Sequence, residues 1–110
     1  MPLEFSVEIR RPGSASFGRL TVTRGRALLE SRRRRHVLAD HVHPQIVVVR
    51  PRINVLDLRT VYVLEGATGT YGVRAGLRST APLREALVDA GFELLELPTL
   101  FGTSLRPPFR

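Results

Sequence analysis

The stretch RSTAPLREALVDAGF, Arg78 to Phe92, decides the fold, because it is the one segment whose pattern predicts a helix. Its apolar residues recur at helical spacing and form a stripe along one side of residues 80–91. The residues of this stripe are Leu83, Ala86, Leu87 and Ala90. A helix this short is marginal alone, so we expect the stripe to pack on strands that precede it.

Both ends of this helix carry recognisable signals. Pro82 suits the first helical turn, and the hydroxyls of Ser79 and Thr80 can cap the free N–H groups there. Gly91 stands where a left-handed residue commonly ends a helix. Phe92 is then expected to pack back on the last turn.

Upstream of the helix, alternating apolar and polar residues and one short apolar run predict strands. The predicted strands are Phe5–Arg10, Phe17–Arg24, Ala27–Glu30, His36–Ala39, Gln45–Arg50, Arg59–Glu65 and Thr70–Ala75. The run Ile46–Val49 predicts a central strand covered on both faces. Arg52–Leu58 is ambiguous, and Glu93–Leu97 forms either a last strand or a cover for the helix end.

These elements predict a mainly β (α+β) fold of about seven short antiparallel strands. We expect a barrel or an orthogonal sandwich capped by the C-terminal helix. Strands and helices do not alternate, so parallel pairing is not expected. Residues 1–97 are expected to form a single domain, and residues 98–110 a C-terminal tail that folds back or docks on a partner.

Composition excludes several classes of protein. The chain of 110 residues has no cysteine, which excludes disulfides and thiolate chemistry. The N-terminus lacks the layout of a signal peptide, and the longest aliphatic run is too short to span a bilayer. We therefore expect a cytoplasmic protein without a transmembrane segment.

The net charge is +7, and all 17 basic residues are arginine. The lack of lysine indicates a GC-rich genome; the alternative is that arginine serves contacts with phosphate or carboxylate. Such a charge favours anionic partners through long-range attraction.

The run Arg32–Arg35 is the most unusual local feature. Like charges repel, so these side chains are expected on a solvated turn. They form either a hairpin tip or a site for nucleic-acid phosphates or an acidic membrane. The predicted anion-binding residues are Arg24, Arg26, Arg32, Arg33, Arg34, Arg35, Arg50 and Arg52. No aromatic stacking stripe accompanies them, so nucleic acid would be bound with little sequence preference.

The other polar clusters give weaker indications of a functional site. His36, Asp40, His41 and His43 could offer ligands to zinc, but the adjacent arginines repel a cation, so no metal site is predicted. The serines and carboxylates show no nucleophile elbow and no acid–base pair. We therefore predict no catalytic residue, no cofactor and no enzyme activity.

The order of strands followed by one helix resembles the pleckstrin-homology-like fold. The segments IVVVRPRINVLDLRTVYVLEG, LREALVDAGFEL and LFG are also similar to small proteins of GC-rich bacteria. This resemblance implies a non-enzymatic binding scaffold, a role that related domains fill for phosphoinositides or peptides. The basic pattern of the lipid-binding members across their first hairpin is not reproduced around Phe17 to Arg19.

Together these observations predict a non-catalytic binding or scaffold module. Its partner would be a protein, or another copy, met through a strand edge, or else an anionic lipid surface. The alternative is a nonspecific nucleic-acid-binding protein that uses an arginine patch.

Overall fold

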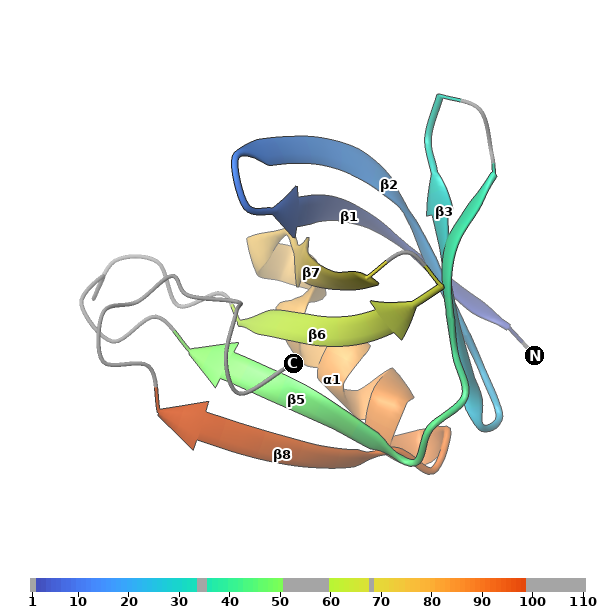
Figure 1. Ribbon diagram of the computed structural model, residues 1–110. Coiled ribbons are helices and arrows are strands. Elements are labelled where there is room, and N and C mark those ends of the chain that lie inside the picture. Colours follow the sequence, from blue (N-terminus) through green and yellow to red (C-terminus); the bar gives the residue numbers. More distant parts are fainter. Residues whose placement is uncertain (1, 34–35, 51–59, 68, 99–110) are drawn as a thin grey trace.

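The computed structural model describes residues 2–33, 36–50, 60–67 and 69–98 (Figure 1). The first strands are β1 (Leu3–Arg11), β2 (Ser14–Thr23), β3 (Arg26–Ser31), β4 (Val37–His41) and β5 (Gln45–Arg50). They are followed by β6 (Val61–Gly66), β7 (Gly69–Ala75), the 3-10 turn η1 (Leu77–Ser79), the helix α1 (Thr80–Asp89) and β8 (Glu93–Pro98). Residues 51–59, which include the whole of the ambiguous segment Arg52–Leu58, and the tail 99–110 lie outside the described part.

The described strands form one sheet in the order β4-β3-β2-β1-β7-β6-β5-β8. A mainly β fold with a C-terminal helix is therefore confirmed. The seven predicted strands are present, and Glu93–Leu97, left open as a last strand, lies in β8. The predicted sandwich is wrong, because the described strands form one sheet. The sheet is also not closed into a barrel, because β4 and β8 are its end strands.

The last strand also breaks the expected antiparallel pattern. β8 pairs with β5 in parallel, from Gln45 opposite Glu93 to Arg50 opposite Pro98. The antiparallel pairs β5–β6 and β6–β7 make β7 and β8 run in the same direction. Parallel strands need a crossover connection, and α1 provides it between β7 and β8. The crossover escaped the sequence analysis because it occurs once, at the end of a run of hairpins.

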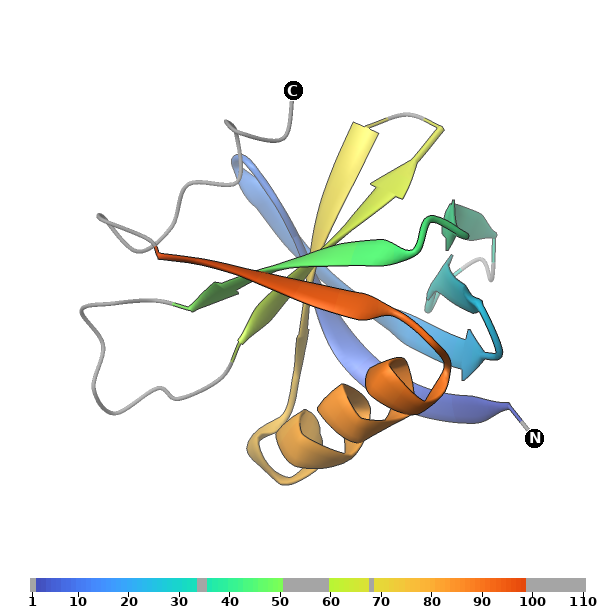
Figure 2. The same ribbon diagram turned by 90° about the horizontal axis from the view of Figure 1, so that it is seen from below.

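Helix α1 covers one face of the sheet. It lies behind β5, β6 and β7 in Figure 1 and beside β8 in Figure 2. Leu83, Ala86 and Leu87 are buried, so the predicted apolar stripe is confirmed. In the described part of the chain, no helix is long and apolar enough to cross a membrane.

The helix ends as its sequence predicts but begins differently. Gly91 has φ 99°, its N–H donates to the carbonyl of Val88, and the N–H of Phe92 donates to the carbonyl of Leu87 (3.0 and 3.1 Å). This double hydrogen bond is the Schellman motif. The predicted hydroxyl cap is wrong, because Ser79 makes no capping bond and the hydroxyl of Thr80 donates to the carbonyl of Gly76 instead.

Two apolar clusters lie on opposite faces of β5 and β6. Ile46 and Val48 belong to the main core, which includes the helix stripe. Val49 packs with Val61 and Val63 in a second cluster. The prediction that the aliphatic run forms a strand covered on both faces is therefore confirmed.

The edge of β4 lies against the end of β6, although no strand ladder joins them in the described residues. The two strands meet at Gly66, where a Cβ would lie 2.5 Å from the carbonyl oxygen of Leu38. His41, 2% exposed, spans this seam. Its Nδ1 accepts the backbone N–H of Glu65 (3.2 Å), so its Nε2 carries the hydrogen and donates to the carbonyl of Gln45 (2.9 Å). One side chain thus links β4, β5 and β6.

Replacing Leu87 with Ala should lower the free energy of unfolding by about 2–5 kcal/mol, because it leaves a cavity between α1 and the sheet. Val88→Ala is the matched control on the same helix; Val88 is 53% exposed, so its loss should cost less than about 0.5 kcal/mol. Denaturant unfolding measures both. Equal losses would mean that α1 does not dock through this stripe.

Acid should destabilise the protein through His41. Burial lowers the pKa of His41 below its ordinary value of 6.5; nearby His43 lowers it further, while Glu65 and the bond to Gln45 act in the opposite direction. The stability that neutral His41 contributes is therefore present above pH 6.5 and lost as the pH falls towards the lowered pKa. Protonation of Nδ1 also removes the acceptor for the Glu65 N–H.

Thermal unfolding measured between about pH 8 and pH 4 tests this expectation. His41→Gln should flatten the decline below pH 6.5, whereas the control His36→Gln, at an exposed histidine that does not act on His41, should keep it. A decline of the same steepness in His41→Gln would assign the acid sensitivity to other groups.

Candidate ligand-binding groove

The arginines predicted to bind anions do not form one patch in the described structure. Arg24 and Arg26 lie at the start of β3, and Arg32 and Arg33 follow its other end. A strand of this length separates the two groups by about 17 Å, at about 3.3 Å per residue. Arg34, Arg35 and Arg52 lie outside the described residues, and Arg50 ends β5. Anion binding by any of them stays a prediction.

Arg26 has a structural partner. Its Nε and Nη2 donate to the two carboxylate oxygens of Asp40, at 2.7 and 2.8 Å. The hydrogen bond from Arg26 is the main reason why the pKa of Asp40 is lowered, and the same pair raises the pKa of Arg26. This pair joins β3 to β4 at the surface.

The histidine cluster is divided among structural roles. Asp40 is paired with Arg26, His41 spans the seam, and Nε2 of His43 lies 3.6 Å from a carboxylate oxygen of Glu65. The carbonyl of His36 accepts the N–H of Ser31. Among the described residues, no three histidine or carboxylate side chains are grouped to hold a metal ion.

An open groove of about 610 Å³ crosses β1, β2, β3 and β7 on the face of the sheet opposite the core. Strand register places its outward-facing side chains in two cross-strand rows. One row is Ser6, Arg19 and Glu30, and the other is Arg74, Glu8 and Phe17. Arg32 closes the end of the groove beyond β3. The sheet thus holds these side chains on paired strands rather than on loops.

Small residues form the floor between the two rows. Val7, Gly18 and Ala75 are partners across the strands at this level and point to the other face. Gly18 lets β3 come close, because a Cβ there would collide with the carbonyl oxygen of Glu30 and with the end of the Ile9 side chain. A side chain at this position would change the spacing of β2 and β3 beneath the groove.

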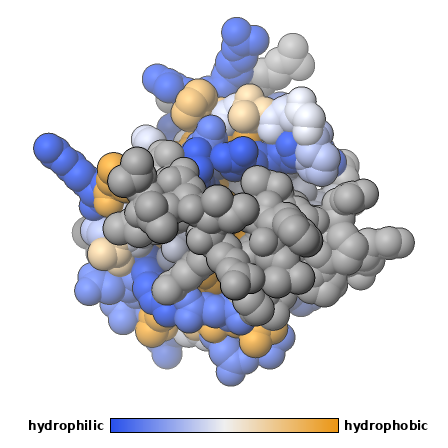
Figure 3. Space-filling view, turned by 90° about the vertical axis from the view of Figure 1, so that its left-hand side faces the viewer, coloured by the Kyte–Doolittle hydropathy of each residue, from blue (hydrophilic) through white to orange (hydrophobic). Residues whose placement is uncertain are grey.

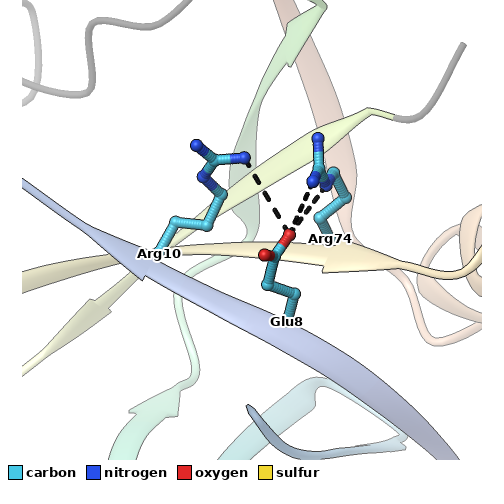
Figure 4. Close-up of polar contacts among 3 residues, drawn as sticks. All are labelled: Glu8, Arg10 and Arg74. Atoms are coloured by element: carbon cyan, nitrogen blue, oxygen red, sulfur yellow. Dashed lines mark hydrogen bonds and ion pairs between the residues drawn. The ribbon is translucent and has the colours of Figure 1, made fainter. Parts of the chain in front are cut away.

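Ion pairs hold the central charges of the groove. Nε of Arg74 donates to one carboxylate oxygen of Glu8 (3.0 Å). Nη2 of Arg74 and Nη1 of Arg10 form ion pairs with the same oxygen, at 2.7 and 3.9 Å (Figure 4). The side chains of Arg74 and Glu8 are 13% and 23% exposed. Nη1 of Arg19 lies 3.5 Å from a carboxylate oxygen of Glu4, which does not line the groove. Glu8 is thus surrounded by positive charge, and Arg74 is fixed in place.

At the end of the groove where Arg32 lies, the backbone rather than an ion pair holds the residue in place. The backbone N–H of Arg32 donates to the carbonyl of Phe17 (3.2 Å), which ties the turn after β3 to β2. The Phe17 side chain at this end is 61% exposed. No ion pair joins Arg32 to a carboxylate within the described ranges.

The polar side chains of the described lining are hydroxyls, carboxylates and guanidinium groups. Its hydroxyls belong to Ser6 and Ser31, and none of its described residues is a histidine or a cysteine. Nucleophilic catalysis by serine needs an adjacent base, and an acid–base mechanism needs a carboxylate free to exchange protons. Glu8 instead accepts a hydrogen bond from Nε of Arg74 and forms an ion pair with its Nη2.

Sequence analysis missed this groove. Glu8 and Arg19 lie at polar positions of the predicted strands Phe5–Arg10 and Phe17–Arg24, but nothing local indicates that Arg74 lies beside Glu8, 66 residues earlier. The only sequence signal for the groove is the set of polar residues at the outward positions of the alternating strands. Only the pairing of β1 with β7 turns them into one row.

Replacing Glu8 with Gln should lower the free energy of unfolding by about 1.5–3 kcal/mol, because it removes the negative charge that pairs with the mostly buried guanidinium of Arg74. Glu4→Gln removes the same charge from the exposed pair with Arg19 and should cost less than about 1 kcal/mol. Denaturant unfolding of both variants compares the two pairs. Equal effects would mean that the Glu8–Arg74 pair contributes no more than a surface contact.

Comparison of the chain with protein-family models, curated proteins and solved structures found no match. The resemblance to the pleckstrin-homology-like fold therefore stays a prediction from the order of the elements. A strand that follows the helix, as β8 does, is not part of that pattern.

Proposed function

We propose that the protein is a non-catalytic binding module that holds a segment of a partner protein in the groove across β1, β2, β3 and β7. The observation that carries this proposal is the groove itself, whose central charges are held by ion pairs on paired strands. Its volume falls within the range of about 300–1,000 Å³ that is usual for ligand sites. A preformed site loses little conformational entropy when it binds.

The charges of the groove favour a protein segment over a nucleic acid. Its lining carries three arginines, Arg19, Arg32 and Arg74, and two glutamates, Glu8 and Glu30. Nucleic acid is bound through surfaces of one sign that neutralise successive phosphates. A polypeptide offers charges of both signs together with backbone hydrogen-bonding groups, which suits a mixed lining.

The described residues on the face shown in Figure 3 give less support for other contacts. In Figure 3 the described residues at one end of the molecule show small hydrophobic areas among hydrophilic ones. Stable protein interfaces usually centre on a contiguous apolar area. Self-association through the edge of β8, an end strand of the sheet, would instead depend on backbone pairing.

Nonspecific nucleic-acid binding is the second candidate, and the net charge of +7 favours it. Against it, Arg19, Arg26 and Arg74 are engaged in ion pairs. An electrophoretic shift assay across a salt series separates the two candidates. Salt-dependent binding of unrelated oligonucleotides would favour the second.

A random peptide library displayed on phage, selected on the folded full-length chain, tests the first proposal. Ser6→Tyr should fill the groove and weaken the selected peptides about tenfold or more, because it places a ring among the lining side chains. Ser16→Tyr is the matched control, since Ser16 is exposed on β2 and does not line the groove.

Thermal unfolding of both tyrosine variants checks that they fold, and the affinities are measured by fluorescence anisotropy. Failure to select any peptide would contradict the proposal. Equal affinity of the two variants for the selected peptides would contradict it as well, because binding would then lie elsewhere.

A further inference from the structure

We infer that the end of the groove at Arg32 is a subsite for a carboxylate, so that the segment bound there is acidic. This inference rests on the proposed function and names the chemistry of its ligand. It depends on three features of the described structure: which groove arginines already have partners, how Arg32 is held, and what lies beside it.

Two of the three arginines that line the groove already form ion pairs within the protein. Arg74 forms a hydrogen-bonded ion pair with Glu8, and Arg19 lies 3.5 Å from Glu4. Arg32 is exposed and has no ion pair with any described carboxylate. A guanidinium presents paired donors that match a carboxylate in a bidentate geometry. Arg32 is therefore the groove arginine that can offer this geometry to a ligand.

The backbone of Arg32 is anchored at the groove. Its N–H bond to the carbonyl of Phe17 extends the pairing of β2 and β3 by one residue, next to the pair of Gly18 and Ser31. The position from which the side chain starts is thereby set by the sheet. Arg33, the next residue in the same turn, is also exposed but does not line the groove.

The surroundings of Arg32 suit an acidic side chain in a polypeptide. The exposed ring of Phe17 offers an apolar contact for the aliphatic part of the segment, and Ser31 lines the same end. Glu30 also lines the groove and stands beside its strand partner Arg19. It disfavours a second carboxylate at its own position, so the preferred segment carries its acidic residue at the Arg32 end.

The test uses the peptides selected on the wild-type chain, each synthesised with a fluorescent label in two forms. In the second form every Asp is replaced by Asn and every Glu by Gln. The wild-type chain should bind the acidic forms about tenfold more tightly, the difference expected for one charge-assisted contact. Anisotropy titrations are made at about 0.15 M salt, where exposed charges are screened beyond about 8 Å.

Two variants of the arginine run make the test specific. Arg32→Gln should abolish most of the preference for acidic peptides, a loss of about tenfold in affinity, while Arg33→Gln removes the same charge from the same turn and should change affinity less than about twofold. The amide forms of the peptides should bind all three chains alike.

Several results would overturn the inference. Equal losses in Arg32→Gln and Arg33→Gln would indicate long-range attraction rather than a subsite. Equal binding of acidic and amide peptides, with the groove still blocked by Ser6→Tyr, would refute the carboxylate and leave the proposed function standing. Binding of a single-stranded oligonucleotide in place of any peptide would refute both.

Discussion

The burial of one stripe of α1 against the sheet is the contact on which the rest of this fold depends. A short helix and a curved sheet each leave an apolar face that must be covered. Leu83 and Leu87 provide that cover, and the Schellman motif at Gly91 turns the chain into β8 beside β5. Arg84 of the helix lies 3.6 Å from Glu96 of β8, so the crossover is also linked at the surface.

The other end of the sheet is protected differently. An unpaired edge can recruit other strands, and closed barrels remove this risk by pairing every strand. Here β4 approaches β6 at Gly66 without a ladder, and His41 satisfies backbone groups of both Glu65 and Gln45. The seam is therefore held by a titratable side chain. This arrangement couples the integrity of the sheet to proton concentration more directly than a backbone ladder would.

Ion pairs decide what the abundant arginines can do. Composition alone favours an anionic partner, but Arg26 and Arg74 are used to join neighbouring strands, to Asp40 and Glu8. The pairs leave a groove whose central charges are fixed and whose end carries Arg32 beside Phe17. Under the proposed function, the groove selects its ligand by the position of its charges, whereas net charge sets only the long-range attraction.

Much of the local structure could be derived from the chain as printed. Apolar alternation located seven strands to within a few residues, the stripe of Leu83 and Leu87 identified the docking face of the helix, and Gly91 marked its end. These features are set by periodicity and backbone preference over a few neighbouring residues, so a short window of sequence contains them.

Tertiary structure alone decided the strand order, the parallel place of β8 and the groove. Glu8 and Arg74 meet because β1 pairs with β7 across 66 residues of sequence, and Arg32 reaches the groove because β3 ends beside Phe17. Each of these contacts depends on the register between distant segments. Register follows from how all the apolar faces are buried at once, which no single stretch of the sequence determines.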